Sequence, residues 1–216
     1  PFALEEIEKN ISIASNSNAQ TSKEQILKQA ITFHSEGNIS EAAKLYQYFI
    51  NQGFKDYRVF SNYGIILKQL GKSKEAELSY RKAIELNPNF ANAHYNLGNV
   101  LKDLGKSKEA GVSYRKAIEL NPDFADAHLN LGSTLSDLGK SKEAEVSYRK
   151  AIELNPDLAE AHSNLGNILN DLGKFQDAET HYRKAIELKP NYAEAYSNLG
   201  GILKDLGKVE EAEVSI

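Results

Sequence analysis

Apolar residues recur along this chain at spacings of three and four positions, which is the period of an amphipathic helix. Residues 125–158 show this pattern twice. The first apolar set is Ala127, Leu131, Leu135 and Leu138, and the second is Ala144, Tyr148, Ala151 and Ile152. Gly139 separates the two sets and Pro156 follows the second, and both residue types commonly mark helix ends. The pattern therefore predicts two antiparallel helices joined by a short turn.

This helix pair repeats every 34 residues. The stretch from Leu70 to Pro88 returns almost unchanged from Leu104 to Pro122 and from Leu138 to Pro156. Such a period is typical of repeat architectures, in which each unit buries its open apolar face against the next. We therefore predict an all-α solenoid of stacked antiparallel helix pairs. Its units are residues 23–56, 57–90, 91–124, 125–158, 159–192 and a partial unit, 193–216.

Both ends of the chain depart from the repeat. Residues 1–22 predict an amphipathic segment followed by a polar linker, because apolar residues at helical spacing give way to a run rich in serine and asparagine. The last unit stops at Ile216, inside its second expected helix. Exposed apolar patches often find partners, so we expect homo-association through this uncapped end. The apolar residues concerned are Leu199, Ile202, Leu203, Leu206 and Val214.

The repeated positions resemble the tetratricopeptide repeat (TPR) family, in its consensus-like bacterial form. The matching positions of one unit are Leu97, Gly98, Ala110, Tyr114, Ala117 and Pro122. Those of another unit are Leu165, Gly166, Ala178, Tyr182, Ala185 and Pro190. The resemblance covers residues 23–216 and implies a right-handed superhelix, with a concave groove lined by the first helix of each unit. It also implies binding of proteins or peptides in place of catalysis.

Charge and composition narrow the classes of partner. The formal net charge is −4, so no attraction to nucleic acid or to an anionic membrane is expected. No apolar run approaches the roughly 18–20 residues of a membrane span. The lack of cysteine excludes disulfides, thiolate metal ligands and a cysteine nucleophile. We expect a cytoplasmic protein, but the chain begins at Pro1, so a secretion signal removed with the missing start stays open.

Signatures of catalysis are missing from the sequence. There is no GxxxxGK[ST], HExxH or GxSxG motif, and no GxGxxG after a strand. Histidine recurs as His94, His128 and His162, but stacked rungs roughly 10 Å apart are too distant to share a zinc ion bound at about 2 Å. Phe60 and Tyr196 fill the same slot in other units, which favours packing. We predict no enzyme activity, no metal site and no cofactor.

An asparagine ladder is the strongest candidate for a binding site. The sixth position of five units holds Asn62, Asn96, Asn130, Asn164 and Asn198; the ninth holds Asn99 and Asn167; the thirteenth holds Asp103, Asp137, Asp171 and Asp205. These positions share one helical face, opposite the apolar set. Asparagine is a mediocre helix former, and its amide both donates and accepts hydrogen bonds. We therefore predict that this asparagine face binds the backbone of an extended peptide, unless duplication merely copied the asparagines.

Two further comparisons bear on the partner. The ladder is similar to that of the O-linked N-acetylglucosamine transferases, in which it holds extended peptide. Another TPR group binds C-terminal carboxylates through a lysine and arginine clamp, but the corresponding positions here lack that clamp. Acidic residues outnumber basic ones on the asparagine face. We therefore expect an extended partner that is neutral to basic.

Two functions are compatible with this sequence. We predict a non-enzymatic scaffold or adaptor that holds a peptide or a partner protein. The alternative is the substrate-recognition arm of a larger glycosyltransferase, methyltransferase or sulfotransferase whose catalytic domain follows Ile216. Reading the gene beyond this position would separate the two.

Overall fold

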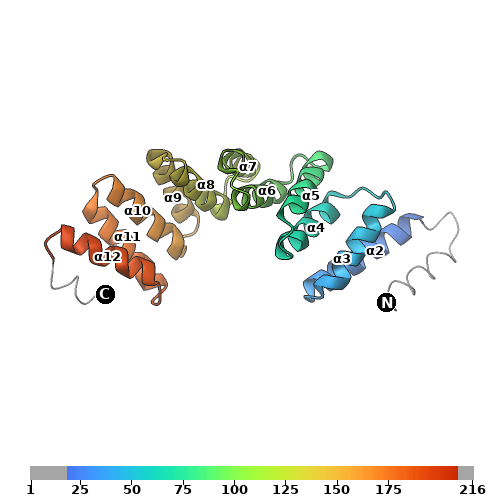
Figure 1. Ribbon diagram of the computed structural model, residues 1–216, viewed down its shortest axis with the longest axis horizontal. Coiled ribbons are helices and arrows are strands. Elements are labelled where there is room, and N and C mark those ends of the chain that lie inside the picture. Colours follow the sequence, from blue (N-terminus) through green and yellow to red (C-terminus); the bar gives the residue numbers. More distant parts are fainter. Residues whose placement is uncertain (1–18, 209–216) are drawn as a thin grey trace. The chain divides into compact units, whose positions relative to one another are not determined.

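The computed structural model describes residues 19–208, and the regular secondary structure of this range is entirely helical (Figure 1). These helices fall into two compact units, which divide between Pro88 and Asn89. The helices of the first unit are α2 (Ala19–Ser35), α3 (Ile39–Asn51), α4 (Tyr57–Gln69) and α5 (Ser73–Leu86). Those of the second unit are α6 (Ala91–Asp103), α7 (Ser107–Leu120), α8 (Ala125–Asp137), α9 (Ser141–Leu154), α10 (Ala159–Asp171), α11 (Phe175–Leu188) and α12 (Ala193–Asp205). The predicted all-α class is confirmed.

The 34-residue period is visible in the helix bounds. The helices α4, α6, α8, α10 and α12 begin at residues 57, 91, 125, 159 and 193, the first positions of the predicted units. The start of α2 at Ala19 differs from the prediction, because the last four residues of the expected linker, 19–22, are helical. The rest of the predicted N-terminal segment, residues 1–18, lies outside the described residues.

A glycine in the left-handed conformation ends the first helix of each pair. Gly139, with φ 72°, is the example between α8 and α9. The amide of Gly139 donates to the carbonyl of Ser136, and the amide of Lys140 donates to that of Leu135. These two bonds satisfy carbonyl groups that the helix end leaves without intrahelical donors, and glycine adopts this backbone conformation without a Cβ clash. The turn reverses the chain, so that α9 returns along α8.

Close helix approach within a pair depends on a second glycine. A Cβ atom placed on Gly132 would lie 2.7 Å from the ring of Tyr148, which is buried between α8 and α9. The same relation holds between Gly98 in α6 and Tyr114 in α7, at 2.6 Å. Each tyrosine thus occupies the space that the missing side chain leaves.

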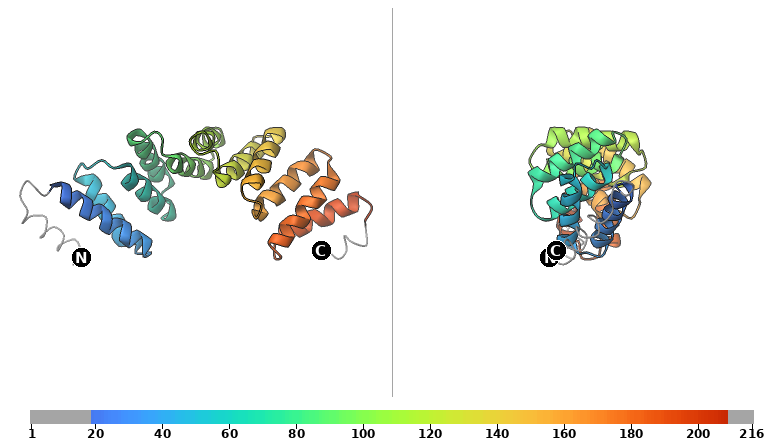
Figure 2. Two further views of the ribbon diagram at one scale, coloured as in Figure 1. Left: turned by 180° about the vertical axis from the view of Figure 1, so that it is seen from behind. Right: turned by 90° about the vertical axis from the view of Figure 1, so that its right-hand side faces the viewer.

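Successive pairs of the second unit stack on one another. The helices α7 and α8, α9 and α10, and α11 and α12 are in contact across the junctions. The orange and red helices α10, α11 and α12 lie side by side in both Figure 1 and the left view of Figure 2. The first helices also touch in the order α6, α8, α10, α12. This row of first helices carries the predicted asparagine face.

Ion pairs on the second helices join one pair to the next. Glu145 in α9 binds Arg149 on the same helix at 2.9 Å and Lys174, in the turn before α11, at 3.1 Å. In α7 the position equivalent to Glu145 is Gly111, which offers no carboxylate. Lys140, the counterpart of Lys174, instead pairs with Glu143, in the helix that follows it, at 2.8 Å.

The C-terminal end differs from the expectation of an open apolar face. Leu199, Ile202 and Leu203 are at most 3% exposed, and Leu206 is half-buried. The expectation that Leu199, Ile202 and Leu203 are exposed is therefore wrong. Val214 and the stretch expected to form the second helix of the last unit lie outside the described residues, and homo-association through this end stays a prediction.

Candidate functional site

Four helices of the second unit present the asparagine face. The helices α6, α8, α10 and α12 each carry an asparagine at the sixth position and end on an aspartate at the thirteenth. The asparagines are half-buried, whereas the aspartates are exposed. These residues are Asn96, Asn130, Asn164 and Asn198, with Asp103, Asp137, Asp171 and Asp205. Because each first helix touches the next, the predicted side chains form one continuous row.

Hydrogen bonds between successive pairs hold Asn130 in this row. Its Nδ2 donates to Oδ1 of Asn99 in the preceding first helix, at 2.9 Å, and to the hydroxyl of Tyr95, at 3.2 Å. The hydroxyl of Tyr114 donates to the same Asn99 oxygen, at 2.8 Å. Asn99 thus accepts one bond from its own unit and one from the next. A net contribution of about 0.5–1.5 kcal/mol per bond makes Asn130 part of the stacking contact.

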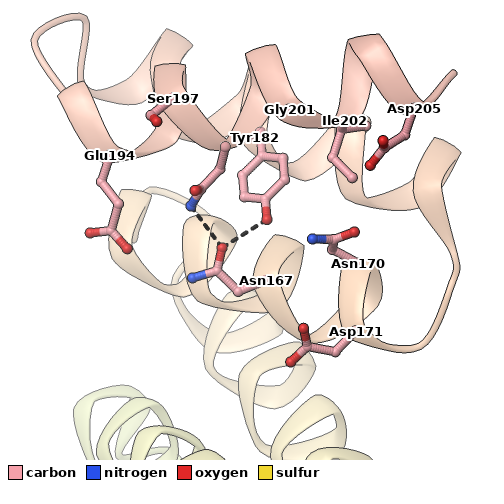
Figure 3. Close-up of a pocket in the computed structure, with 10 residues that line it drawn as sticks. Asn167, Asn170, Asp171, Tyr182, Glu194, Ser197, Gly201, Ile202 and Asp205 are labelled. Atoms are coloured by element: carbon pink, nitrogen blue, oxygen red, sulfur yellow. Dashed lines mark hydrogen bonds between the residues drawn. The ribbon is translucent and has the colours of Figure 1, made fainter. Parts of the chain in front are cut away.

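The same arrangement recurs two units later. Nδ2 of Asn198 donates to Oδ1 of Asn167 at 2.9 Å, and the hydroxyl of Tyr182 donates to that oxygen at 2.7 Å. Figure 3 shows the two bonds as dashed lines that meet at the side chain of Asn167. Both asparagines were predicted to bind a ligand, and the structure also gives them a role in packing.

Asn96 and Asn164 differ from the other two asparagines of the second unit. No hydrogen bond to either amide side chain occurs within residues 19–208. In the unit before Asn164 the ninth position is Ser133, whose hydroxyl accepts from Nζ of Lys102 at 2.6 Å. In the sequence, the ninth position before Asn96 is Ile65, which has no polar side chain. Along the row, side-chain amides that bond to the preceding unit therefore alternate with side-chain amides that have no such bond.

The first unit holds the remaining member of the ladder. Nδ2 of Asn62 in α4 donates to the hydroxyl of Tyr46 in α3, at 3.3 Å. Tyr46 is fully buried, so Asn62 satisfies a core hydroxyl of the preceding pair. The distance is at the long end for a hydrogen bond, which indicates a weak one.

A polar concavity of about 340 Å³ lies between α10, α11 and α12 (Figure 3). Four predicted site residues line it: Asn167, Asn198, Asp171 and Asp205. The other lining residues are Asn170, Tyr182, Glu194, Ser197, Gly201 and Ile202. The lining contains three carboxylates and no basic side chain, so the concavity favours cationic or hydrogen-bonding ligand groups.

The electrostatics of the row agree with that preference. Burial raises the pKa of the Tyr182 hydroxyl, and the charges of Asp171 and Glu194 raise it further. The phenol therefore stays protonated at neutral pH and remains a donor to Asn167. Farther along the row, Nζ of Lys102 lies 3.5 Å from Asp137 and reduces the negative field there.

Sequence reasoning left several lining residues out of the predicted site. Asn170 and Ser197 vary in type between units, so the repeat gave no signal for them. Tyr182 was named only as a position that matches the repeat pattern, and in the structure its ring fills the gap beside Gly166. Its hydroxyl, however, reaches the asparagine row.

In the described part of the chain, no group of three or more histidine, aspartate or glutamate side chains is placed to hold a metal ion. None of the helices within residues 19–208 is long and apolar enough to cross a bilayer.

Comparison with known families agrees with the repeat geometry. The sequence model of the TPR repeat matches residues 64–105, 98–139, 133–173 and 166–207, which together exceed half of the chain. The chain belongs to the tetratricopeptide repeat family. No curated protein matches this TPR sequence.

Solved structures share the TPR fold of this chain. YrrB, described as a TPR protein with an unusual peptide-binding site, is 28% identical with a TM-score of 0.70, and the match covers 81% of this chain and 90% of YrrB. A MamA structure is 28% identical with a TM-score of 0.67, covering 70% of this chain and 89% of MamA. PilF of Pseudomonas aeruginosa has a TM-score of 0.78 over 89% of this chain and 87% of its own, but at 16% identity it shows the fold alone.

Proposed function

We propose that this TPR protein is a non-catalytic scaffold that binds an extended, neutral to basic peptide segment along its asparagine face. The observation that carries the proposal is the alternation of that face. Asn130 and Asn198 are engaged in stacking, whereas the side-chain amides of Asn96 and Asn164, at the same helical position, have no hydrogen bond in the described structure. Half-buried amides without a partner are free to pair with a peptide N–H and C=O.

Two further observations support a peptide as the ligand. The concavity between α10 and α12 is lined by amides, hydroxyls and carboxylates, which suit a backbone and a basic side chain. YrrB, which matches most of this chain, is described as having a peptide-binding site. The rival function, an arm of a larger enzyme, would use the same face in the same way and stays a prediction.

The test is a binding experiment with an array of synthetic peptides that differ in net charge. Peptides of about ten residues suffice, because an extended chain of roughly 3.3 Å per residue then spans about three stacked units. The tightest-binding peptide is titrated against the wild type and against a variant with both Asn96→Ala and Asn164→Ala. Each lost hydrogen bond costs about 0.5–1.5 kcal/mol, so affinity should fall by roughly one to two orders of magnitude.

The matched control carries Asn130→Ala and Asn198→Ala. This variant removes donors to Asn99 and Asn167, so it should lower the unfolding midpoint. The Asn96 and Asn164 variant should unfold at the same midpoint or higher, because alanine is the better helix former. Undiminished peptide affinity in that variant, or binding only of acidic peptides, would reject the proposed function.

A further inference from the structure

Histidine recurs at the fourth position of three units, and in one of these units it contacts a second histidine. In the unit 159–192, His162 in α10 and His181 in α11 face each other with their Nδ1 atoms 3.0 Å apart and their ring centroids 5.2 Å apart. His162 is 7% exposed, and His181 is half-buried. The pair thus combines a buried imidazole with one that solvent reaches.

Neighbouring groups determine which nitrogens carry protons. Nε2 of His162 lies 3.2 Å from the carbonyl oxygen of Pro156, which only accepts, so this nitrogen is the protonated one. Burial lowers the pKa of both rings. Burial together with the neighbouring His162 and Arg149 brings the pKa of His181 to about 4. Both rings are therefore neutral at pH 7. Nδ1 of His162 then presents a lone pair, and Nδ1–H of His181 donates to it.

The sister units show that this arrangement is particular to one repeat. His128 occupies the slot of His162 and approaches the Pro122 carbonyl in the same way, at 3.1 Å. The position equivalent to His181 is Ser147 in that unit, and its hydroxyl donates to the carbonyl of Glu143. Only the substitution of serine by histidine at residue 181 adds the second imidazole.

We propose that His162 and His181 bind a divalent transition-metal ion through their Nδ1 atoms. The ion takes the place of the proton between the rings. That proton moves to Nε2 of His181 by exchange with solvent, so both rings stay neutral, and water completes the coordination. The Nε2–H of His162 stays bonded to the Pro156 carbonyl, which is how proteins commonly fix the orientation of a metal-bound histidine.

The spacing of the two nitrogens selects among metals. At metal–nitrogen distances of about 2.1 Å, a separation of 3.0 Å gives an angle of about 90° at the ion. Neighbouring ligands of square-planar or tetragonal Cu²⁺ and Ni²⁺ adopt this angle, whereas tetrahedral zinc requires a wider one. Both rings turn to aim their lone pairs at the ion. Imidazole suits copper, and Cu²⁺ also heads the affinity order, so it is the probe of choice.

The test is calorimetric titration of the full chain with Cu²⁺, compared between the wild type and His181→Ser. This substitution restores the serine of the sister units, so the fold should be kept, and circular dichroism checks this. We expect the wild type to bind Cu²⁺ at least about tenfold more tightly than the variant, in line with the losses caused by impaired metal sites. Equal affinity in the two proteins would overturn the proposal.

A gain-of-site variant gives a second, independent readout. Ser147→His places an imidazole opposite His128, so the titration should show an additional tight Cu²⁺ equivalent. Electron paramagnetic resonance should show coupling to two nitrogens in the wild type and to fewer in His181→Ser. If instead the pair only changes protonation below neutral pH, and no nitrogen coupling appears, the pair is a proton site and the metal proposal is rejected.

Discussion

At the scale of single residues, a tyrosine ring occupies the space that a β-carbon would need at the eighth position of the unit. The Cβ of an alanine at residue 98 would lie 2.6 Å from the Tyr114 ring, which is completely buried. The ninth position of the unit has more space. In α12 this position is Gly201, and a Cβ placed there would meet nothing within 4 Å.

Gly98→Ala should therefore destabilise the protein by about 1–3 kcal/mol, which is the usual cost of overpacking a core. Gly201→Ala, the matched control, should stabilise it by about 0.5–1 kcal/mol, because alanine is favoured over glycine in a helix. Urea unfolding followed by circular dichroism measures both. Similar unfolding midpoints for the two variants would contradict the steric argument.

The structure departs most from the sequence-based predictions in the hydrogen bonds of single side chains. The periodicity placed Asn130 and Asn164 on one helical face, and the structure does so too. Their different hydrogen bonding depends on the ninth position of the preceding unit, Asn99 or Ser133, which faces them across a helix contact. Spacing within one helix carries no information about that contact, so the two asparagines looked equivalent in sequence.

At the scale of elements, Gly111 removes one carboxylate from the ion pairs that join second helices to the following unit. Arg115 and Lys140 would flank a carboxylate at this position, as Arg149 and Lys174 flank Glu145. Instead both contact Glu143, at 3.2 and 2.8 Å. A Cβ at Gly111 would be 3.7 Å from its nearest neighbour, so a side chain fits.

Gly111→Ala should stabilise the protein by about 1 kcal/mol through helix propensity. Gly111→Glu should add roughly 0.2–1 kcal/mol from the surface ion pairs, and this increment should disappear in high salt. Thermal unfolding at low and high salt separates the two contributions. The interpretation fails if glutamate is less stabilising than alanine at low salt.

The bounds of these elements were largely predictable. Glycine after the first helix and proline after the second act locally, so the units 57–90 to 159–192 begin where the sequence places them. The start of α2 was missed because a polar composition suggested a linker, although Ala19 and Gln20 are both good helix formers.

At the scale of the whole molecule, the contacts that build the solenoid join helices that are near one another in sequence. In the second unit each helix touches its neighbours or next neighbours along the chain. Stability is then close to a sum of unit and junction contributions. This modularity follows from the period, and the sequence predicted it. The hydrogen bonds and ion pairs at each junction could not be predicted from the period, because they depend on which side chains meet across the junction.

Deleting residues 125–158 should therefore leave a folded protein, because the ends of the neighbouring units join as before. Helical content per residue should stay constant while the unfolding midpoint falls, since one junction is lost. Circular dichroism and urea unfolding measure the two quantities. A collapse of helical content would show that distant contacts carry the fold.

The near-identity of the stretches ending at Pro88, Pro122 and Pro156 has a consequence for how the chain finds its native state. A second helix from one unit would fit beside the first helix of another almost as well as beside its own, so mispairing by one whole repeat costs little energy. The positions at which units differ, such as Gly111 and His181, are then what distinguishes correct from shifted pairings. Making the repeats more alike would leave each contact intact and still slow folding, through misregistered traps of nearly native energy.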